Sequence, residues 1–279
     1  MRPSTAVVYC AIDSLISVQA RELTGFSTFL EALTEAGIPC VWCTSRTRIQ
    51  MDARIRKFGH GHPFVGEGGC GVYIPEDYFH LKPSRTMRQG RFTCIPVAMP
   101  LPAASQALEE IAEETGISVV PLSALSPREL SQNAGLPQKE AELLRQRDFD
   151  ELFFFAGASD KDVQVFAGAA AKHKAALRQR DIFWSISIGA DMRRCVRELS
   201  TLFERSMRAR PFNVALARSE DGRDLFPACD RAILLKDRSE TEVEHVVSPG
   251  FEKRQALELQ LFSPQVWERA LEAIQTRQF

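Results

Sequence analysis

Short apolar runs alternate with segments of helical periodicity at the start of the chain. The run VVYCAI (residues 7–12) has the composition of a strand buried on both faces. A helical pattern follows over about residues 21–36 and stops at Gly37, a second strand is predicted at IPCVWCTS (38–45), and a second helix at RTRIQMDARIRKF (46–58). This order of strand, helix, strand and helix is typical of a parallel sheet with crossover helices.

The middle of the chain, from about residue 79 to 188, has a different rhythm. Its predicted helices are ALEEIAEETG (107–116), PQKEAELLRQ (137–146) and DKDVQVFAGAAAKHKAALRQ (160–179), and its predicted strands are ISVVPL (117–122), FDELFFFAG (149–157) and DIFWSISIG (181–189). After Gly189 the first rhythm returns, with helices predicted at 191–206 and 263–275, the latter capped by Ser263, and strands predicted at FNVALARS (212–219) and RAILL (231–235). One α/β segment inside another predicts an inserted domain. We therefore expect a core from residues 1–83 and 190–279, with an inserted domain at 84–189.

Composition and charge exclude several classes of protein. Hydrophobic residues make up 44% of the chain and charged residues 25%, which predicts a folded protein with a buried core. The net charge of −1 gives no basic excess, so we expect no nucleic-acid partner. There is no apolar stretch of membrane-spanning length and no signal-like segment, so we expect a cytoplasmic protein without a membrane partner.

The seven cysteines are predicted to be reduced thiols. Their odd number, without a signal-like segment, argues against a disulfide framework. Cys40 and Cys43 form a CxxC pattern, but they lie on a predicted strand, where residues three apart point to opposite faces. We therefore interpret them as core residues rather than as zinc ligands or a redox pair.

Polar residues follow three of the predicted strands. In an open parallel α/β sheet, ligands bind at the carboxyl ends of the strands. The candidates at these ends are Asp13 and Ser14 after the first strand, Thr44, Ser45 and Arg46 after the second, and Arg218, Ser219, Glu220 and Asp221 after FNVAL.

Five segments occur in an order that is characteristic of one known family. They are CTSRTRIQM (43–51), PFVGEGGCGVYIP (63–75), RDFDELF (147–153), GADMRRCV (189–196) and ALARSEDGRDLFPACD (215–230). They resemble the second motif, the PFIxENGxxIYxP segment, the REFDEPF-type cap segment, the NDKGKAV-like run and the LGDSxNDxPMLxxxD motif of the mannosyl-3-phosphoglycerate phosphatases. This family belongs to the haloacid dehalogenase superfamily. The resemblance implies an α/β fold, with a doubly wound parallel-sheet core and an inserted α/β cap domain, and a magnesium-dependent phosphatase ancestry.

The residues that perform the family's reaction are replaced in this chain. The family's first motif is DxDGT, in which the first Asp is the nucleophile and the second is the general acid and base. Here the motif reads AIDSL, so Ala11 stands at the nucleophile position and Asp13 at the second. The resemblance places Met192 where the family has its Lys, and Arg218 and Gly222 where it has metal-binding carboxylates. A methyl group cannot attack phosphorus, and Mg²⁺ loses its ligands. We therefore expect that the family's Mg²⁺ site is lost, that no other cofactor binds and that the protein does not turn over substrate.

Some polar positions of the family site are kept. The resemblance marks Asp13 as the one retained catalytic position, and Arg147 and Glu151 as positions where the family's cap contacts substrate. The family's RF(Y/W)H segment reads IFWS (182–185) here, without the Arg and the His. For anion or substrate binding the candidates are Thr44, Ser45, Arg218, Ser219, Arg147 and Glu151, and for a metal, if one binds, they are Asp13, Glu220 and Asp221.

Each candidate also has a structural interpretation. Arg218 either faces Asp13 and replaces the missing cation in an anion site, or pairs with Asp13 or Glu220 and only fills the cavity that the lost groups vacate. Asp13 can hydrogen-bond within its own loop, and Thr44 and Ser45 can cap the following helix. Arg147 and Glu151 can form a solvated pair or make contacts between the cap and the core.

Three functions remain open on the sequence. The first is a non-catalytic homologue that binds a phosphorylated sugar or glycerate, or a protein partner. The second is an active sugar-phosphate phosphatase that uses a rearranged site, with Glu220 and Asp221 as metal ligands. The third is a structural interaction protein that uses only its surface.

Overall fold

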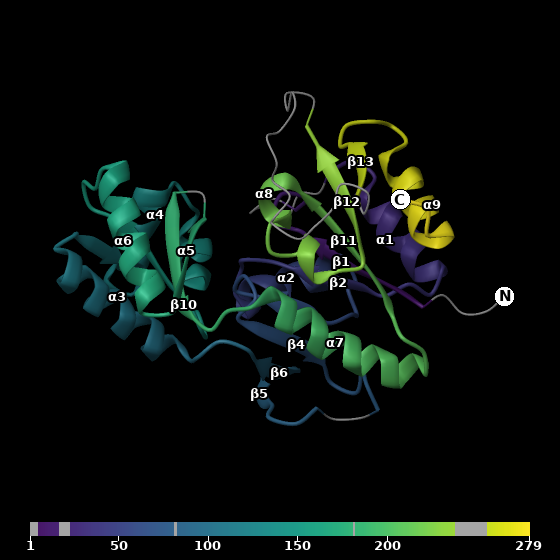
Figure 1. Cartoon of the computed structure of the whole chain (residues 1–279), viewed down its shortest axis with the longest axis horizontal. Helices are drawn as coiled ribbons and strands as arrows, with labels where there is room; N and C mark the ends of the chain where they lie inside the picture. Colours follow the sequence, from purple (N-terminus) through teal and green to yellow (C-terminus); the bar gives the residue numbers. More distant parts are fainter. Residues whose placement is uncertain (1–4, 17–22, 81–82, 181, 238–255) are drawn as a thin grey trace.

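The computed structural model of the chain describes residues 5–16, 23–80, 83–180, 182–237 and 256–279 (Figure 1). Within these ranges the strands form two sheets, with the orders β13-β12-β11-β1-β2-β3-β4-β6-β5 and β7-β8-β10-β9. In the large sheet the strands are β13 (Ala256–Gln260), β12 (Arg231–Lys236), β11 (Phe212–Arg218), β1 (Ala6–Ala11), β2 (Cys40–Cys43), β3 (Phe64–Gly66), β4 (Gly71–Pro75), β6 (Phe92–Pro96) and β5 (Met87–Gln89). In the small sheet they are β7 (Val119–Pro121), β8 (Glu151–Phe155), β10 (Phe183–Ile188) and β9 (Ala175–Arg180).

The strand β1 lies between β2 and β11 and is parallel to both. Val8 is opposite Cys40 on one side and Val214 on the other. The predicted strands VVYCAI and FNVAL therefore share one sheet, and the predicted doubly wound α/β core with an inserted α/β domain is confirmed. Because the chain leaves β1 toward β2 and later returns to β11 on the other side, the carboxyl end of β1 is a topological switch point, where such sheets bind ligands.

Helices cover both faces of the large sheet. Alternate residues of β1 point to opposite faces, as expected for a strand buried on both sides. One face packs against α1 (Phe26–Glu35), α2 (Arg48–Lys57) and α9 (Val266–Thr276), and the other against α7 (Met192–Met207) and η2 (Phe226–Ala228). The short helix α8 (Ser219–Gly222) directly follows β11. Figure 1 shows α1 and α9 together at one side of the core and α7 along another.

The small sheet and its helices form a separate layered unit, seen at the left of Figure 1. Phe153, Phe166 and Ile186 belong to the cluster between this sheet and two long helices, and Leu152 and Phe183 pack on its other face. The helices of this unit are α3 (Leu101–Thr115), η1 (Leu122–Ala124), α4 (Pro127–Ala134), α5 (Gln138–Leu144) and α6 (Asp160–Lys172). We call residues 99–189 the cap and the remainder the core.

The cap begins later than the sequence predicts. Residue 84 is the predicted boundary, but β5 and β6 beyond it belong to the large sheet, where β6 pairs with β4. Phe92 and Cys94 of β6 are buried in the core, and Gly90, with φ +62°, makes the tight turn between the two strands. The alternate side chains of β6 are buried because β6 pairs with β4 in the large sheet, so this segment extends the core and the cap starts after it.

Three helix predictions are corrected at their ends. The helix predicted over 107–116 begins earlier, at Leu101. The helix predicted over 160–179 ends at Lys172, and residues 175–180 form β9. Lys174, with φ +56°, reverses the chain, after which β9 pairs antiparallel with β10. The last helix begins at Val266 with Gln265 at its N-cap, so Ser263 does not cap it. The predicted start of the first helix, near residue 21, lies outside the described residues, and α1 is described from Phe26.

The two cysteines of the CxxC pattern lie on β2, as predicted. Both are free and buried, and they belong to the clusters on opposite faces of the sheet. None of the helices in the described ranges has both the length and the apolar character needed to cross a membrane.

Candidate functional site

A cleft of about 740 Å³ lies between the carboxyl ends of the core strands and the cap. On the core side it is lined by residues at the ends of β1 and β2, which include Ala11, Asp13, Thr44 and Ser45. On the cap side it is lined by residues of β9 and β10, which include Arg178, Arg180 and Trp184. The cleft therefore occupies the switch-point position that the parallel sheet predicts.

Asp13 is fully engaged on the core side of this cleft. Its Oδ1 accepts hydrogen bonds from the Thr44 hydroxyl and, at 2.6 Å, from Nη1 of Arg46, while its Oδ2 accepts from the backbone N–H of Ser45 at 2.6 Å. Arg46 also donates to the carbonyl of Ile16 at 2.8 Å. Burial by itself would raise the pKa of the Asp13 carboxyl, but the Arg46 charge and the bonds from Ser45 and Thr44 lower it below its ordinary value. Asp13 is thus an ionised carboxylate with a built-in cation.

Ala11 and Met192 bring no reactive group to the cleft. Ala11 is the last residue of β1 and is 5% exposed, and Met192 is the first residue of α7 and is 8% exposed; both line the cleft. The start of α7 is held against the core because Gly69 accepts hydrogen bonds from the N–H of Asp191 at 3.1 Å and the thiol of Cys195 at 3.4 Å. A methyl and a thioether can neither attack phosphorus nor bind Mg²⁺.

Arg218 does not face Asp13, so that expectation is wrong. Its Nη2 lies 2.5 Å from a carboxylate oxygen of Asp237 and 3.7 Å from one of Glu220. Neither Arg218 nor the buried Ser219 is among the described residues that line the cleft. Arg46 takes the place that the sequence analysis gave to Arg218. The sequence contained an indication of this, because Arg46 directly follows the polar pair at the end of the second strand.

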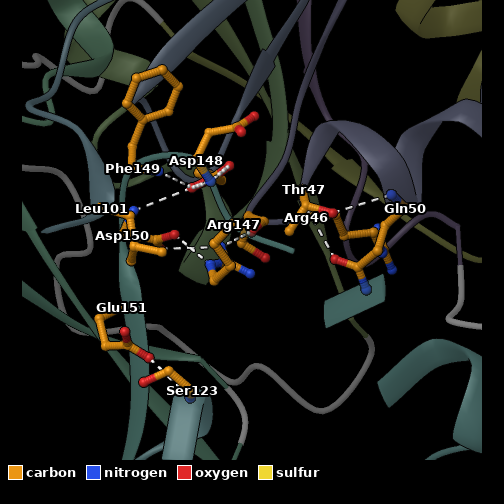
Figure 2. A network of polar contacts seen from close by, with 12 residues as sticks. Arg46, Thr47, Gln50, Leu101, Ser123, Arg147, Asp148, Phe149, Asp150 and Glu151 are labelled. Carbon is orange, nitrogen blue, oxygen red and sulfur yellow. Dashed lines mark hydrogen bonds and ion pairs between the residues drawn. The ribbon is translucent and has the colours of Figure 1, made fainter. Parts of the chain in front are cut away.

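Arg147 and Glu151 are buried outside the cleft, in the polar network of Figure 2. Arg147 forms a two-pronged ion pair with Asp150, with Nη2 3.1 Å from Oδ2, and donates to the carbonyl of Ser45 at 2.9 Å. Glu151 accepts from the Ser105 hydroxyl at 2.9 Å and from the N–H of Ser123 at 3.3 Å, both within the cap. Arg147 therefore joins the cap to the core, as one structural interpretation expected, whereas Glu151 makes its contacts within the cap.

Glu67 joins the core to the same segment of the cap. Its carboxyl accepts the backbone N–H groups of Asp148, Phe149 and Asp150 at 2.9–3.3 Å. Burial, reinforced by the negative charge of Asp150, raises the pKa of Glu67 to about 8. The sequence analysis did not single out Glu67, because no local pattern shows which backbone groups a loop carboxyl will meet.

Two further contacts hold the cap against the core. Glu140 of α5 lies 3.3 Å from the side-chain amide nitrogen of Gln50 and 3.7 Å from the guanidinium of the buried Arg54, both on α2. Figure 2 shows the N-terminus of α2, where Thr47 and Gln50 cap the helix reciprocally. Near the cleft, Arg178 of the cap lies 2.9 Å from Asp224 of the core.

The carboxylates near the cleft do not fit a magnesium ion. Glu220 and Asp221 line the cleft with Asp13, but Asp13 already binds Arg46, and Glu220 is near Arg218. Burial raises the pKa of Asp221, which disfavours the ionised form that a metal requires. In the described part of the chain, no three His, Cys, Asp or Glu side chains are grouped so that they could hold a metal ion.

The cap contributes two arginines that the sequence analysis missed. Arg178 and Arg180 lie on β9, within the segment predicted as helix, and both line the cleft. Arg178 donates to the carbonyl of Gly68 at 3.1 Å and pairs with Asp224. A strand prediction at 175–180 would have placed both side chains on one face, because residues two apart on a strand point the same way.

Comparison with known proteins gives related phosphatases but no matching family model. The chain is 25% identical over 210 residues to the glucosyl-3-phosphoglycerate/mannosyl-3-phosphoglycerate phosphatase of Methanococcoides burtonii, covering 74% of this chain and 75% of that protein. It is 26% identical over 227 residues to the protein of the same name from Persephonella marina, covering 80% and 81%, and 22% identical over 219 residues to the mannosyl-3-phosphoglycerate phosphatase of Pyrococcus furiosus, covering 78% and 86%.

Solved structures share the fold. A protein of Thermoplasma acidophilum superposes with a TM-score of 0.64 at 11% identity, covering 98% of this chain and 99% of that one. A phosphatase of the haloacid dehalogenase superfamily from Bacteroides thetaiotaomicron superposes with a TM-score of 0.62 at 14% identity, covering 98% and 96%. At these identities the similarity establishes the common fold.

Proposed function

We propose that this chain, a homologue of mannosyl-3-phosphoglycerate phosphatases with the haloacid dehalogenase fold, is a non-catalytic protein that binds a phosphorylated sugar or glycerate in its cleft. The observation that supports the proposal best is the position of Ala11, which lines the cleft at the carboxyl end of β1, two residues before the ion-paired Asp13. The resemblance assigns the nucleophile to that position, and a methyl group cannot form a phosphoaspartyl bond.

The rest of the site supports the loss of turnover. Phosphoryl transfer depends on positioned charge around the phosphoryl group, supplied in this family by carboxylate-bound Mg²⁺ and a Lys. Met192 replaces the Lys, and Arg218 and Gly222 replace the metal carboxylates. Asp13 is tied to Arg46, so it is a poor candidate for carrying a proton. No single substitution in the chain would restore this set.

The size and chemistry of the cleft support the retention of a ligand. Ligand pockets typically enclose about 300 to 1,000 Å³, and the cleft volume of about 740 Å³ lies within that range. Arginines, carboxylates and the Trp184 indole line it together, a mixture suited to a polar ligand that also has an anionic group.

An active phosphatase with a rearranged site is the second candidate. The observation in its favour is that Glu220 and Asp221 both line the cleft and lie on the same side as Asp13. Of the described acidic residues that line the cleft, Asp13 pairs with Arg46 and Asp224 with Arg178, which leaves Glu220 and Asp221 for a metal ion. This candidate needs both groups to turn toward one metal ion.

A phosphatase assay with magnesium separates the two. We expect the purified protein to release no phosphate from mannosyl-3-phosphoglycerate or from an aryl phosphate, with one of the related phosphatases as the positive control. Turnover that Asp13→Asn abolishes would establish the rearranged site instead. Thermal shift in EDTA with 3-phosphoglycerate and with glucose 6-phosphate then tests binding, because a ligand that binds the folded state raises the melting temperature. Unchanged melting with both would favour the interaction protein.

A further inference from the structure

Two arginines lie side by side on the edge strand of the cap, facing the cleft. Arg178 and Arg180 are two residues apart on β9 and therefore point to the same face of the strand. The neighbouring Arg178 charge adds to burial in lowering the pKa of the Arg180 guanidinium. Like charges on neighbouring side chains repel, and the Asp224 carboxylate contacts Arg178 at 2.9 Å but forms no ion pair with Arg180.

Most charges around the cleft have protein partners. Asp13 pairs with Arg46, Asp224 with Arg178, and Glu220 lies near Arg218. Arg223 also lines the cleft and has an interaction of its own. In the described part of the chain the buried Nε of Arg180 has no hydrogen-bond partner, and the carboxylates of Asp13 and Asp150 act on its guanidinium through their charges alone.

Gly68 leaves the space in which the Arg180 guanidinium lies. A Cβ atom on residue 68 would come within 2.1 Å of Nη2 of Arg180. The same loop residue accepts a hydrogen bond from Arg178 with its carbonyl, at 3.1 Å. Gly68 of the core thus positions both cap arginines. Its carbonyl binds Arg178, and its lack of a side chain leaves room for Arg180.

We infer that Arg180, with Arg178 beside it, binds the phosphate group of the ligand on the cap side of the cleft, without a metal. The inference deepens the proposed function and rests on it, since it identifies the ligand as a phosphate monoester and names the residue that recognises it. A guanidinium presents a planar set of donors that matches phosphate oxygens, and a dianion would supply the acceptor that the buried Nε of Arg180 lacks. A phosphate held there would meet no nucleophile at Ala11, which lines the same cleft with a methyl group.

Calorimetry with inorganic phosphate and with 3-phosphoglycerate tests this, in EDTA and at low salt. The variants are Arg180→Gln, which removes the charge, and Arg180→Lys, which keeps it but loses the planar fork. Arg128→Gln is the matched control, because Arg128 is an exposed arginine of the same cap. Glucose without phosphate is the ligand control. Urea denaturation of each variant verifies that it is folded.

We expect Arg180→Gln to weaken binding of both phosphates about tenfold or more, the magnitude of one charge-assisted hydrogen bond. Arg180→Lys should weaken phosphate binding several-fold, and Arg128→Gln should leave it unchanged. Binding should weaken with added salt, because a protein cation holds the anion. Equal affinity in wild type, Arg180→Gln and Arg180→Lys would overturn the inference, as would wild type that binds neither probe.

The two proposals fail in different experiments. Magnesium-dependent turnover by the wild type would overturn the non-catalytic function, while binding in EDTA would still report on Arg180. Conversely, unchanged binding by the Arg180 variants would overturn the role of Arg180 and leave the absence of turnover intact.

Discussion

The guanidinium of Arg46 contacts the carboxylate of Asp13, with Nη1 and Oδ1 2.6 Å apart. Both side chains are largely buried, and Thr44 and Ser45 complete the carboxylate's hydrogen bonds. Asp13, which the resemblance assigns to the family's first motif, is therefore held as half of an ion pair. This arrangement favours a structural role for Asp13, in which it fixes the loops at the ends of β1 and β2 along the floor of the cleft.

Asp13→Asn should lower the free energy of unfolding by about 1–3 kcal/mol at neutral pH, because it leaves Arg46 partly buried without its charge partner. The pKa of Asp13 is lowered in the folded state, so its contribution is present above the ordinary pKa of about 3.9 and is lost as pH falls through the folded value. The difference between variant and wild type should therefore shrink in acid. Urea denaturation over a pH series measures it.

Asp52→Asn is the matched control for Asp13, because Asp52 pairs with Arg91 on the surface, where the Arg91 side chain is 50% exposed. It should cost less than about 1 kcal/mol. If the two substitutions cost the same, the buried pair contributes no more than a surface pair.

Glu67→Gln should stabilise the protein at alkaline pH. The folded pKa of Glu67, about 8, lies above that of the unfolded chain, so its stabilising effect is complete below about pH 4.3 and is lost as pH rises through 8. Gln mimics the protonated carboxyl and cannot ionise. Since one pKa unit corresponds to about 1.4 kcal/mol, we expect the variant to gain at least about that much over wild type between pH 5 and pH 9.

Chemical denaturation at several pH values tests the Glu67 prediction. The exposed Glu109 serves as the control position, and Glu109→Gln should leave the pH profile unchanged. Parallel profiles for wild type and Glu67→Gln would show that Glu67 is ionised in the folded protein at neutral pH.

Arg147→Gln should be strongly destabilising. Arg147 and Asp150 are each 4% exposed, and the variant leaves Asp150 buried beside Glu67 without a cation. Breaking such a pair costs about 3–5 kcal/mol, which urea denaturation would detect. Arg88→Gln is the comparison, because Arg88 pairs with Glu76 and its side chain is 77% exposed. This substitution should lower the free energy of unfolding by almost nothing. A loss below 1 kcal/mol for Arg147→Gln would argue against a structural role for Arg147 at the cap–core junction.

Ala11→Asp alone should not produce a phosphatase. The substitution supplies a carboxylate at the nucleophile position, but Met192 and Arg218 remain and Asp13 stays bound to Arg46. The new charge at a position 5% exposed, next to Asp13, should also lower the melting temperature more than the uncharged Ala11→Asn does. Magnesium-dependent release of phosphate by Ala11→Asp would show that the remaining site is still competent.

Gly68→Ala should weaken phosphate binding by displacing Arg180. Gly68 has φ +65°, so the variant also introduces backbone strain of about 1 kcal/mol. Gly116→Ala is matched in strain, since Gly116 has φ +66° and lies in the cap with no atom within 4 Å of a new Cβ. Both variants should lose similar stability, but only Gly68→Ala should lose affinity in calorimetry. If Gly68→Ala and Gly116→Ala bind phosphate with equal affinity, the space at Gly68 does not control the position of Arg180.

The sequence determined the fold through patterns that do not depend on distant contacts. The all-apolar run 7–12 can only be buried on both faces, and the helical spacing after it requires a crossover, so the parallel sheet follows. The spacing of Cys40 and Cys43 placed them on opposite faces of β2 for the same reason. The absence of a carboxylate at residue 11 is also a fact of sequence, and the fold only decides that it lines the cleft.

Tertiary structure alone decided the charges of the site. Residues 175–180 have no alternating pattern that marks them as a strand, and they become one because Lys174 reverses the chain and β10 supplies the hydrogen bonds. That pairing brings Arg178 and Arg180 to the cleft. Likewise Arg46, and not Arg218, meets Asp13, because Asp237 at the end of β12 lies nearer to Arg218. A long flexible side chain pairs with whichever opposite charge the folded backbone brings within reach, and sequence spacing does not encode that choice.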